Sequence, residues 1–108
     1  MKHQNETIFE LQAELCKTLA NPKRLEILSA LKDGEKRVTD LVAIIGISKA
    51  NVSQHLAFMR HKGIVMTRKE GVYIFYSLTS QKIIKACSIM REVLTEQMER
   101  NGKILRAR

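Results

Sequence analysis

Several features that would assign this sequence to a common class of protein are missing from it. No apolar run approaches the roughly 20 residues that cross a bilayer, and residues 1–6 lack the apolar stretch of a signal peptide. There are only two cysteines, and without an export signal they indicate a reducing, cytoplasmic location with no structural disulfide. No glycine-rich phosphate loop is present, and neither cysteine has a base partner that the sequence suggests, so we expect no enzyme and no cofactor.

Acidic residues are nearly absent from one long stretch of the chain. Between Leu41 and Arg91 the only acid is Glu70, and the formal net charge of the whole chain is +8. The basic residues of this stretch are Lys49, Arg60, Lys62, Arg68, Lys69, Lys82, Lys85 and Arg91. Such a one-sided positive field favours a polyanionic partner. A basic surface that only keeps the protein in solution would explain this charge equally well. The partner therefore has to be inferred from motifs.

The length and patterning of the chain predict one domain that begins with a helix. The 108 residues suffice for one modest core, so we predict a single domain over residues 1–108. A first helix is expected over about 5–20, because apolar residues recur three and four positions apart from Ile8 onward. A second apolar stripe beside the first means that this helix is covered on more than one side, which indicates a partner subunit.

Capping residues predict three further helices. Asn21-Pro22 suits the start of a second helix, which is expected to stop at Gly34. A short third helix over about 38–45 ends at a glycine, and Ser48 caps a fourth helix over about 48–61.

The period then changes from helical to extended and back. Residues 64–68 and 72–78 are rich in β-branched and aromatic side chains, and Glu70-Gly71 is expected to form the turn of a hairpin over about 64–78 with a basic tip. Thr79 or Ser80 then caps a last helix over about 80–100 whose apolar spacing is nearly heptad. The apolar residues expected in a dimer interface between first and last helices are Ile8, Leu11, Leu15, Ile83, Met90 and Leu94.

This order of elements is a mainly α (α+β) winged helix-turn-helix, with the helix-turn-helix over about 38–62 and the hairpin as the wing. Gly46 supplies the backbone freedom that the turn requires, and the polar face of residues 48–55 fits a major groove. The residues expected to contact double-stranded DNA are Ser48, Lys49, Asn51, Ser53, Gln54, His55, Arg60, Arg68 and Lys69.

Two alternatives to DNA binding stay open at this point. One is that the polar residues of the fourth helix form only a solvated face. The other is that the winged helix binds a protein or RNA. The aromatic residues mostly fit core or wing packing rather than the stacking of single-stranded bases. A steep fall of affinity with salt, together with preference for one palindrome, would distinguish a DNA-binding regulator from both.

Several motifs carry a resemblance to a known family. They are Leu19-Ala20-Asn21-Pro22-Lys23-Arg24-Leu25-Glu26-Ile27-Leu28, Asp40-Leu41 with Ile47-Ser48, Val52-Ser53-Gln54-His55-Leu56, Gly63-Ile64-Val65 and Tyr76-Ser77-Leu78. Over nearly its whole length the chain resembles the ArsR/SmtB repressors of bacteria and archaea. The resemblance implies a homodimer built from the first and last helices, a fourth helix in the major groove of a palindromic operator, and release by an effector.

The metal sites of similar repressors are not matched here. In members similar to the arsenic and cadmium sensors two thiolates enter the third helix, but Arg37 and Thr39 stand at those places. Members similar to the zinc sensors use Asp, His, His and Glu on the last helix, where this chain has Ser80, Lys82, Val93 and Glu96. One carboxylate cannot hold zinc, which takes about four ligands, so no metal site is expected from these positions.

The two cysteines lie on the two helices expected to form the dimer interface. Similar sulfide- and redox-responsive repressors pair a cysteine on the last helix with one on the second helix, where this chain has Ser29. Cys16 would then take the place of the missing partner of Cys87, and Lys17 and Lys85 would favour the thiolate. Three interpretations stay open: a switch operated by thiol oxidation or persulfidation, an inert buried pair, and the core of a metal or metalloid site.

Overall fold

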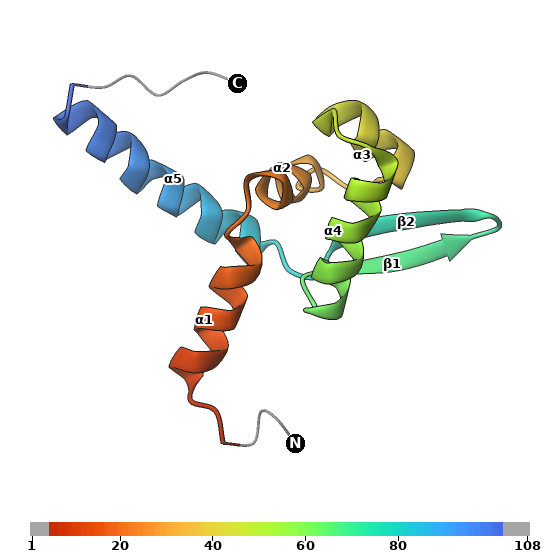
Figure 1. Cartoon of the computed structure of the whole chain (residues 1–108), viewed down its shortest axis with the longest axis horizontal. Helices are drawn as coiled ribbons and strands as arrows, with labels where there is room; N and C mark the ends of the chain where they lie inside the picture. Colours follow the sequence, from red (N-terminus) through yellow and green to blue (C-terminus); the bar gives the residue numbers. More distant parts are fainter. Residues whose placement is uncertain (1–4, 103–108) are drawn as a thin grey trace.

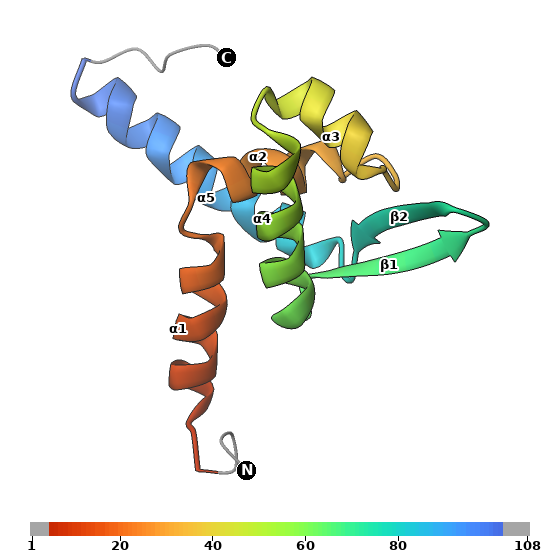
Figure 2. The same ribbon diagram turned by 45° about the vertical axis from the view of Figure 1, so that its right-hand side comes forward.

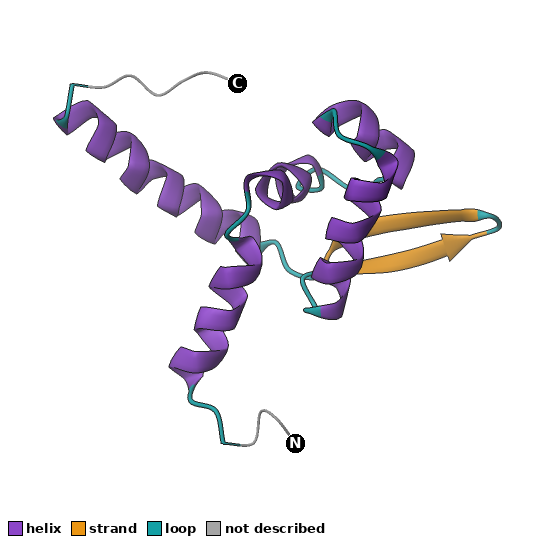
Figure 3. Ribbon diagram, viewed as in Figure 1, coloured by secondary structure: helices purple, strands orange, loops and turns teal. Residues whose placement is uncertain are grey.

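The computed structural model describes residues 5–102 and contains the expected order of elements (Figures 1 and 3). Five helices and one hairpin follow one another as α1 (Ile8–Leu19), α2 (Pro22–Ala30), α3 (Val38–Ile45), α4 (Lys49–His61), β1 (Val65–Glu70), β2 (Tyr73–Leu78) and α5 (Lys82–Arg100). The prediction of a mainly α winged helix-turn-helix is confirmed. Helices α2, α3 and α4 pack together with the hairpin, while α1 and α5 extend away from this body.

Side-chain caps define where the first two helices begin. The Thr7 hydroxyl accepts a hydrogen bond from the Glu10 backbone N–H at 3.1 Å, and the Glu10 carboxylate accepts one from the Thr7 N–H at 2.8 Å. Helix α1 therefore starts at residue 8 rather than at about residue 5. The Asn21 side chain accepts hydrogen bonds from the N–H groups of Lys23 and Arg24 at 2.9 and 3.1 Å, as its position before a proline predicts.

Two further predicted boundaries differ from the structure. Helix α2 ends at Ala30 rather than at Gly34, because the following residues turn toward the hairpin. Helix α5 starts at Lys82. Of the two residues expected to cap it, Ser80 accepts a hydrogen bond from the Lys82 N–H at 3.2 Å, whereas the Thr79 hydroxyl donates to the Gly63 and Ile64 carbonyls at 2.7 and 3.0 Å.

The turn of the hairpin lies one residue later than expected. Glu70 pairs with Tyr73 in the antiparallel register, which leaves Gly71 and Val72 as the turn. The base of the wing is tied to the body by a third extended segment, because Lys36 and Tyr76 exchange backbone hydrogen bonds of 3.0 and 2.8 Å. Strand β2 therefore has β1 on one side and Lys36 on the other, which attaches the wing to the body along its β2 edge.

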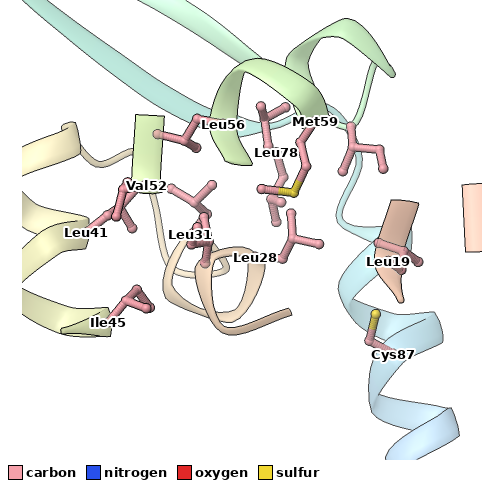
Figure 4. Close-up of a cluster of buried hydrophobic side chains, with 13 residues drawn as sticks. Leu19, Leu28, Leu31, Leu41, Ile45, Val52, Leu56, Met59, Leu78 and Cys87 are labelled. Carbon is pink, nitrogen blue, oxygen red and sulfur yellow. The ribbon is translucent and has the colours of Figure 1, made fainter. Parts of the chain in front are cut away.

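The core forms where α3 and α4 cross over α2 (Figure 4). Leu41 on α3 and Val52 and Leu56 on α4 are completely buried, and Leu28 of α2 and Leu31, which directly follows α2, lie beneath them. Gly46 ends α3 with φ of +80°, in the left-handed region where a side chain is strained. The turn at Gly46 thus lets two apolar faces meet.

Helices α1 and α5 are poorly covered by the rest of the chain. The radius of gyration is 15.7 Å, larger than the roughly 13 Å of a compact domain of about 100 residues.

Within residues 5–102 no single helix is long and apolar enough to cross a membrane. Helices α3 and α4 meet that criterion only as a pair bent by 114°, and by length and composition alone.

We predict that Gly46→Ala lowers the free energy of unfolding by about 1–2 kcal/mol, because a Cβ is strained at this φ. No atom lies within 4 Å of the added Cβ, so the loss is one of backbone conformation rather than of packing. Urea unfolding of the two proteins measures it. The matched variant Gly46→Asn should lose less, since Asn tolerates the left-handed region; equal losses in both variants would contradict the explanation.

Candidate nucleic-acid interface

Helix α4 presents one apolar and one polar face. Val52, Leu56 and Met59 point into the core, and the 3.6-residue period turns the intervening residues outward. The Ser48 hydroxyl caps the helix by accepting a hydrogen bond from the Asn51 N–H at 3.1 Å. Among the residues predicted to contact DNA, the exposed ones on this helix and its cap are Ser48, Lys49, Asn51, Gln54 and Arg60.

Two of the predicted contact residues are less open than the others. Ser53 and His55 are partly buried. Burial lowers the pKa of His55, and the positive charge of Arg24 lowers it further. His55 is therefore neutral at pH 7 and offers one donor and one acceptor rather than a positive charge.

The structure corrects the expectation that Arg68 lies at the tip of the wing. Arg68 sits within β1, opposite Phe75, and its guanidinium lies 4.6 Å from the centre of that ring. It donates to Glu35 at 2.6 and 3.1 Å and to Glu70 at 2.6 Å. These bonds also hold the pKa of Glu35 below its usual range.

The consequence is that the wing presents less free positive charge than its sequence indicates. Glu35 lies 33 residues before Arg68, so no local pattern reveals this pair. Lys69 is exposed, and within residues 5–102 no hydrogen bond or ion pair involves its side chain. Of the two basic residues predicted for the wing, Lys69 is therefore the one whose charge is not paired with a carboxylate.

The two cysteines occupy different environments. Cys16 is exposed on α1, and Cys87 is buried on α5 with its sulfur directed toward Leu19 (Figure 4). A cavity of about 100 Å³ between α2 and α5 is lined by Cys87 and by Ser29. Within residues 5–102 no group of three or more His, Cys, Asp or Glu side chains is placed to hold a metal ion.

The expectation that a neighbouring lysine favours the Cys87 thiolate is wrong. Burial raises the pKa of the Cys87 thiol, and the charge that partly opposes this rise belongs to Arg91 rather than to Lys85. At neutral pH Cys87 is therefore a protonated thiol in this conformation.

Large apolar side chains remain exposed on both outer helices. On α1 the exposed fractions of Ile8 and Phe9 are 69% and 78%. The exposed apolar residues of α5 are Ile89, Met90, Val93 and Leu94. Two apolar helix faces of this size need a cover, which the described part of the chain does not provide.

The residues predicted for the dimer interface divide into two groups. Ile8, Leu15, Met90 and Leu94 are exposed and Leu11 is partly covered, whereas Ile83 packs against the core of its own chain. Sequence reasoning missed Ile89 and Val93, because a heptad pattern places one narrow stripe on α5 and these residues widen it.

Residues 21–67, which contain α2, α3, α4 and part of β1, match the family described as "Bacterial regulatory protein, arsR family". The chain is 31% identical over 103 residues to the HTH-type transcriptional regulator Rv0081 of Mycobacterium tuberculosis. The aligned region covers 94% of this chain and 90% of that protein. The crystal structure of Rv0081 matches with a TM-score of 0.80 over 91% of this chain and 99% of its own.

Two further relatives carry functional names. The biofilm growth-associated repressor of Xylella fastidiosa is 38% identical over 85 residues, or 79% of this chain and 75% of that protein. The transcriptional activator HlyU of Vibrio cholerae is 44% identical over 69 residues, or 64% of each chain. All three relatives are named as transcriptional regulators, and none of them as an enzyme.

Proposed function

This chain belongs to the ArsR family of bacterial transcriptional regulators, which are not enzymes, and we propose that it is a homodimeric repressor that binds a palindromic DNA operator. The observation that carries the proposal is the division of α4 into a fully buried apolar face and an exposed face of hydrogen-bonding residues. A helix of this kind at the surface fits the major groove of B-DNA, which is about 12 Å wide.

The exposed face of α4 has the chemistry for reading bases. Asn51 and Gln54 are exposed amides that can bond both N6 and N7 of adenine, and Lys49 can reach guanine or a phosphate. In the wing we assign a phosphate contact to Lys69 and none to Arg68, since two carboxylates hold the Arg68 guanidinium. Such a phosphate contact positions the protein and carries no sequence information itself.

The dimer follows from the uncovered faces of α1 and α5. Pairing two copies through these faces buries the exposed apolar side chains, which is favourable in proportion to the area removed from water. A two-fold axis between the copies then presents two α4 helices to half-sites about 34 Å apart on one side of the DNA. This symmetry is the reason to expect a palindrome.

We extend the proposal to the effector, which would act on Cys87. Attack of the buried Cys87 sulfur on a polysulfide transfers one sulfur atom to it and releases the shortened polysulfide and the thiol proton; the added sulfur enters the cavity of about 100 Å³ between α2 and α5 and changes how α5 lies against α2. Because α5 belongs to the dimer interface, this change alters the spacing of the two α4 helices. The exposed thiol of Cys16 is the one that an oxidant or a polysulfide reaches first.

Gln54→Ala should weaken binding to the operator by roughly 1–3 kcal/mol while leaving binding to unrelated DNA unchanged, because the amide contacts base edges and not phosphates. Fluorescence anisotropy with DNA from the protein's own promoter region measures both affinities. Gln97→Ala, which removes an exposed amide from α5, is the matched control and should bind like the wild type. Unchanged specificity in Gln54→Ala would show that α4 does not read the bases.

Leu94→Asp should convert the dimer into monomers, because a charge placed in an apolar seam cannot be buried without a partner. Sedimentation velocity of both proteins distinguishes the two states. Val72→Asp, which puts the same charge on an exposed apolar residue at the hairpin turn, should leave the dimer intact. A stable Leu94→Asp dimer would place the interface elsewhere.

Treatment of the reduced protein with polysulfide should lower operator affinity by about tenfold or more, equivalent to about 1.4 kcal/mol. The same anisotropy titration measures the effect before and after treatment. Cys87→Ser should bind DNA normally and lose the response, and Cys16→Ser shows whether the exposed thiol takes part. Equal binding of treated and reduced protein would make both cysteines structural and would direct the search to metals or small ligands.

A further inference from the structure

Helix α1 is joined to the body of the protein through its last turn alone. Its only buried residues are Thr18 and Leu19. The remainder of α1 carries exposed or partly exposed side chains and points away from the other elements (Figure 1). The direction of α1 therefore depends on a few contacts at its carboxyl end.

Arg24 of α2 supplies a contact at this end of α1. Its Nε donates to the Thr18 carbonyl at 2.6 Å, and Nη2 donates to the Lys17 carbonyl at 3.5 Å. The last carbonyls of a helix lack partners within the helix and carry partial negative charge. A guanidinium placed on them thus closes the end of α1 with both hydrogen bonds and charge.

The same guanidinium lies against the proposed reading helix. The Arg24 Cζ is 4.8 Å from the centre of the Phe58 ring on α4, within the range of a cation–π contact. Its charge also reaches His55, which precedes Phe58 by three residues and therefore lies on the same face of α4. In both Figure 1 and Figure 2, α2 lies between the end of α1 and α4.

We propose that Arg24 is a positioning residue that couples the direction of the dimer helix α1 to the position of the reading helix α4. This inference rests on the proposed function. In a dimer built on α1 and α5, the directions of the two α1 helices help to set the distance between the two α4 helices. Arg24 then serves specificity for a palindrome without touching DNA.

The planar shape of the guanidinium is essential to this role. Its N–H groups bond the α1 carbonyls while its Cζ lies over the Phe58 ring, so one group contacts both helices at once. A lysine at the same place keeps the charge but has no planar face. The ring of Phe58 is also approached by Lys62, at 5.7 Å, but Lys62 directly follows α4 in the chain and so cannot join α4 to α1.

The test compares Arg24→Gln and Arg24→Lys with the wild-type dimer. Both variants should lose roughly 5–150-fold in operator affinity, the usual size of a coupling between sites, while affinity for unrelated DNA and its dependence on salt stay unchanged. Lys23→Gln removes a positive charge from the neighbouring position of α2 and should change neither affinity. Sedimentation velocity and thermal unfolding confirm that each variant is a folded dimer.

Two readouts separate coupling from a general loss of structure. In Arg24→Gln the NMR-titrated pKa of His55 should rise, because a neighbouring positive charge is gone, whereas Arg24→Lys should keep it nearer the wild-type value. Phe58→Leu should also lower operator affinity, and the double variant Arg24→Gln/Phe58→Leu should lose less than the sum of the two single losses.

Three results would overturn the inference, and one of them concerns the DNA directly. If affinity for all DNA falls and the salt slope decreases by about 1, Arg24 contacts a phosphate instead. Additive losses in the double variant would show that Arg24 and Phe58 act independently, and unchanged affinity in both Arg24 variants would show no role. A wild-type protein without preference for any palindrome would refute the proposed function, whereas the His55 pKa would still test the Arg24 contact.

Discussion

The burial of one face of α4 is the constraint on which the rest of the structure depends. Val52, Leu56 and Met59 are fully buried, so α4 cannot rotate about its axis without exposing them to water. With these three side chains inward, Asn51 and Gln54 must point outward. Packing thus selects the side chains that α4 would present to a DNA groove. The turn at Gly46 allows α3 to pack on the buried face of α4 and complete the core.

Local signals in the sequence predicted the elements, and contacts between distant residues explain what they did not predict. The caps at Asn21 and Ser48 and the left-handed turn at Gly46 each depend on neighbours within three residues, so their positions follow from the sequence. The pairing of Arg68 with Glu35 joins residues 33 positions apart, and no periodicity contains that information. The exposed residues of α4 follow from the helical period and could be predicted, whereas the pairing of Arg68 in the wing could not.

The outer helices show the limit of what one chain can bury. Apolar residues at helical spacing made it possible to predict that α1, with its second apolar stripe, and α5 need a cover, but not how wide the cover of α5 must be. Val93 lies outside the narrow stripe that the heptad spacing gives α5, and it is exposed. In contrast, Ile83 fits the stripe by spacing and yet packs on its own core, because the start of α5 lies against the body while its end extends away.

The distribution of paired and unpaired charges favours recognition led by α4 over recognition led by the wing. Net charge suggested a broad basic surface, but Arg68 is engaged by two carboxylates and Arg37 lies 3.6 Å from the Asp40 carboxylate. Within residues 5–102 no ion pair involves Lys49 or Arg60, which lie on α4. Exposed ion pairs are weak individually, yet they decide where uncompensated positive charge remains. Lys49 and Arg60 keep their uncompensated charge on the helix whose other exposed side chains can distinguish one base from another.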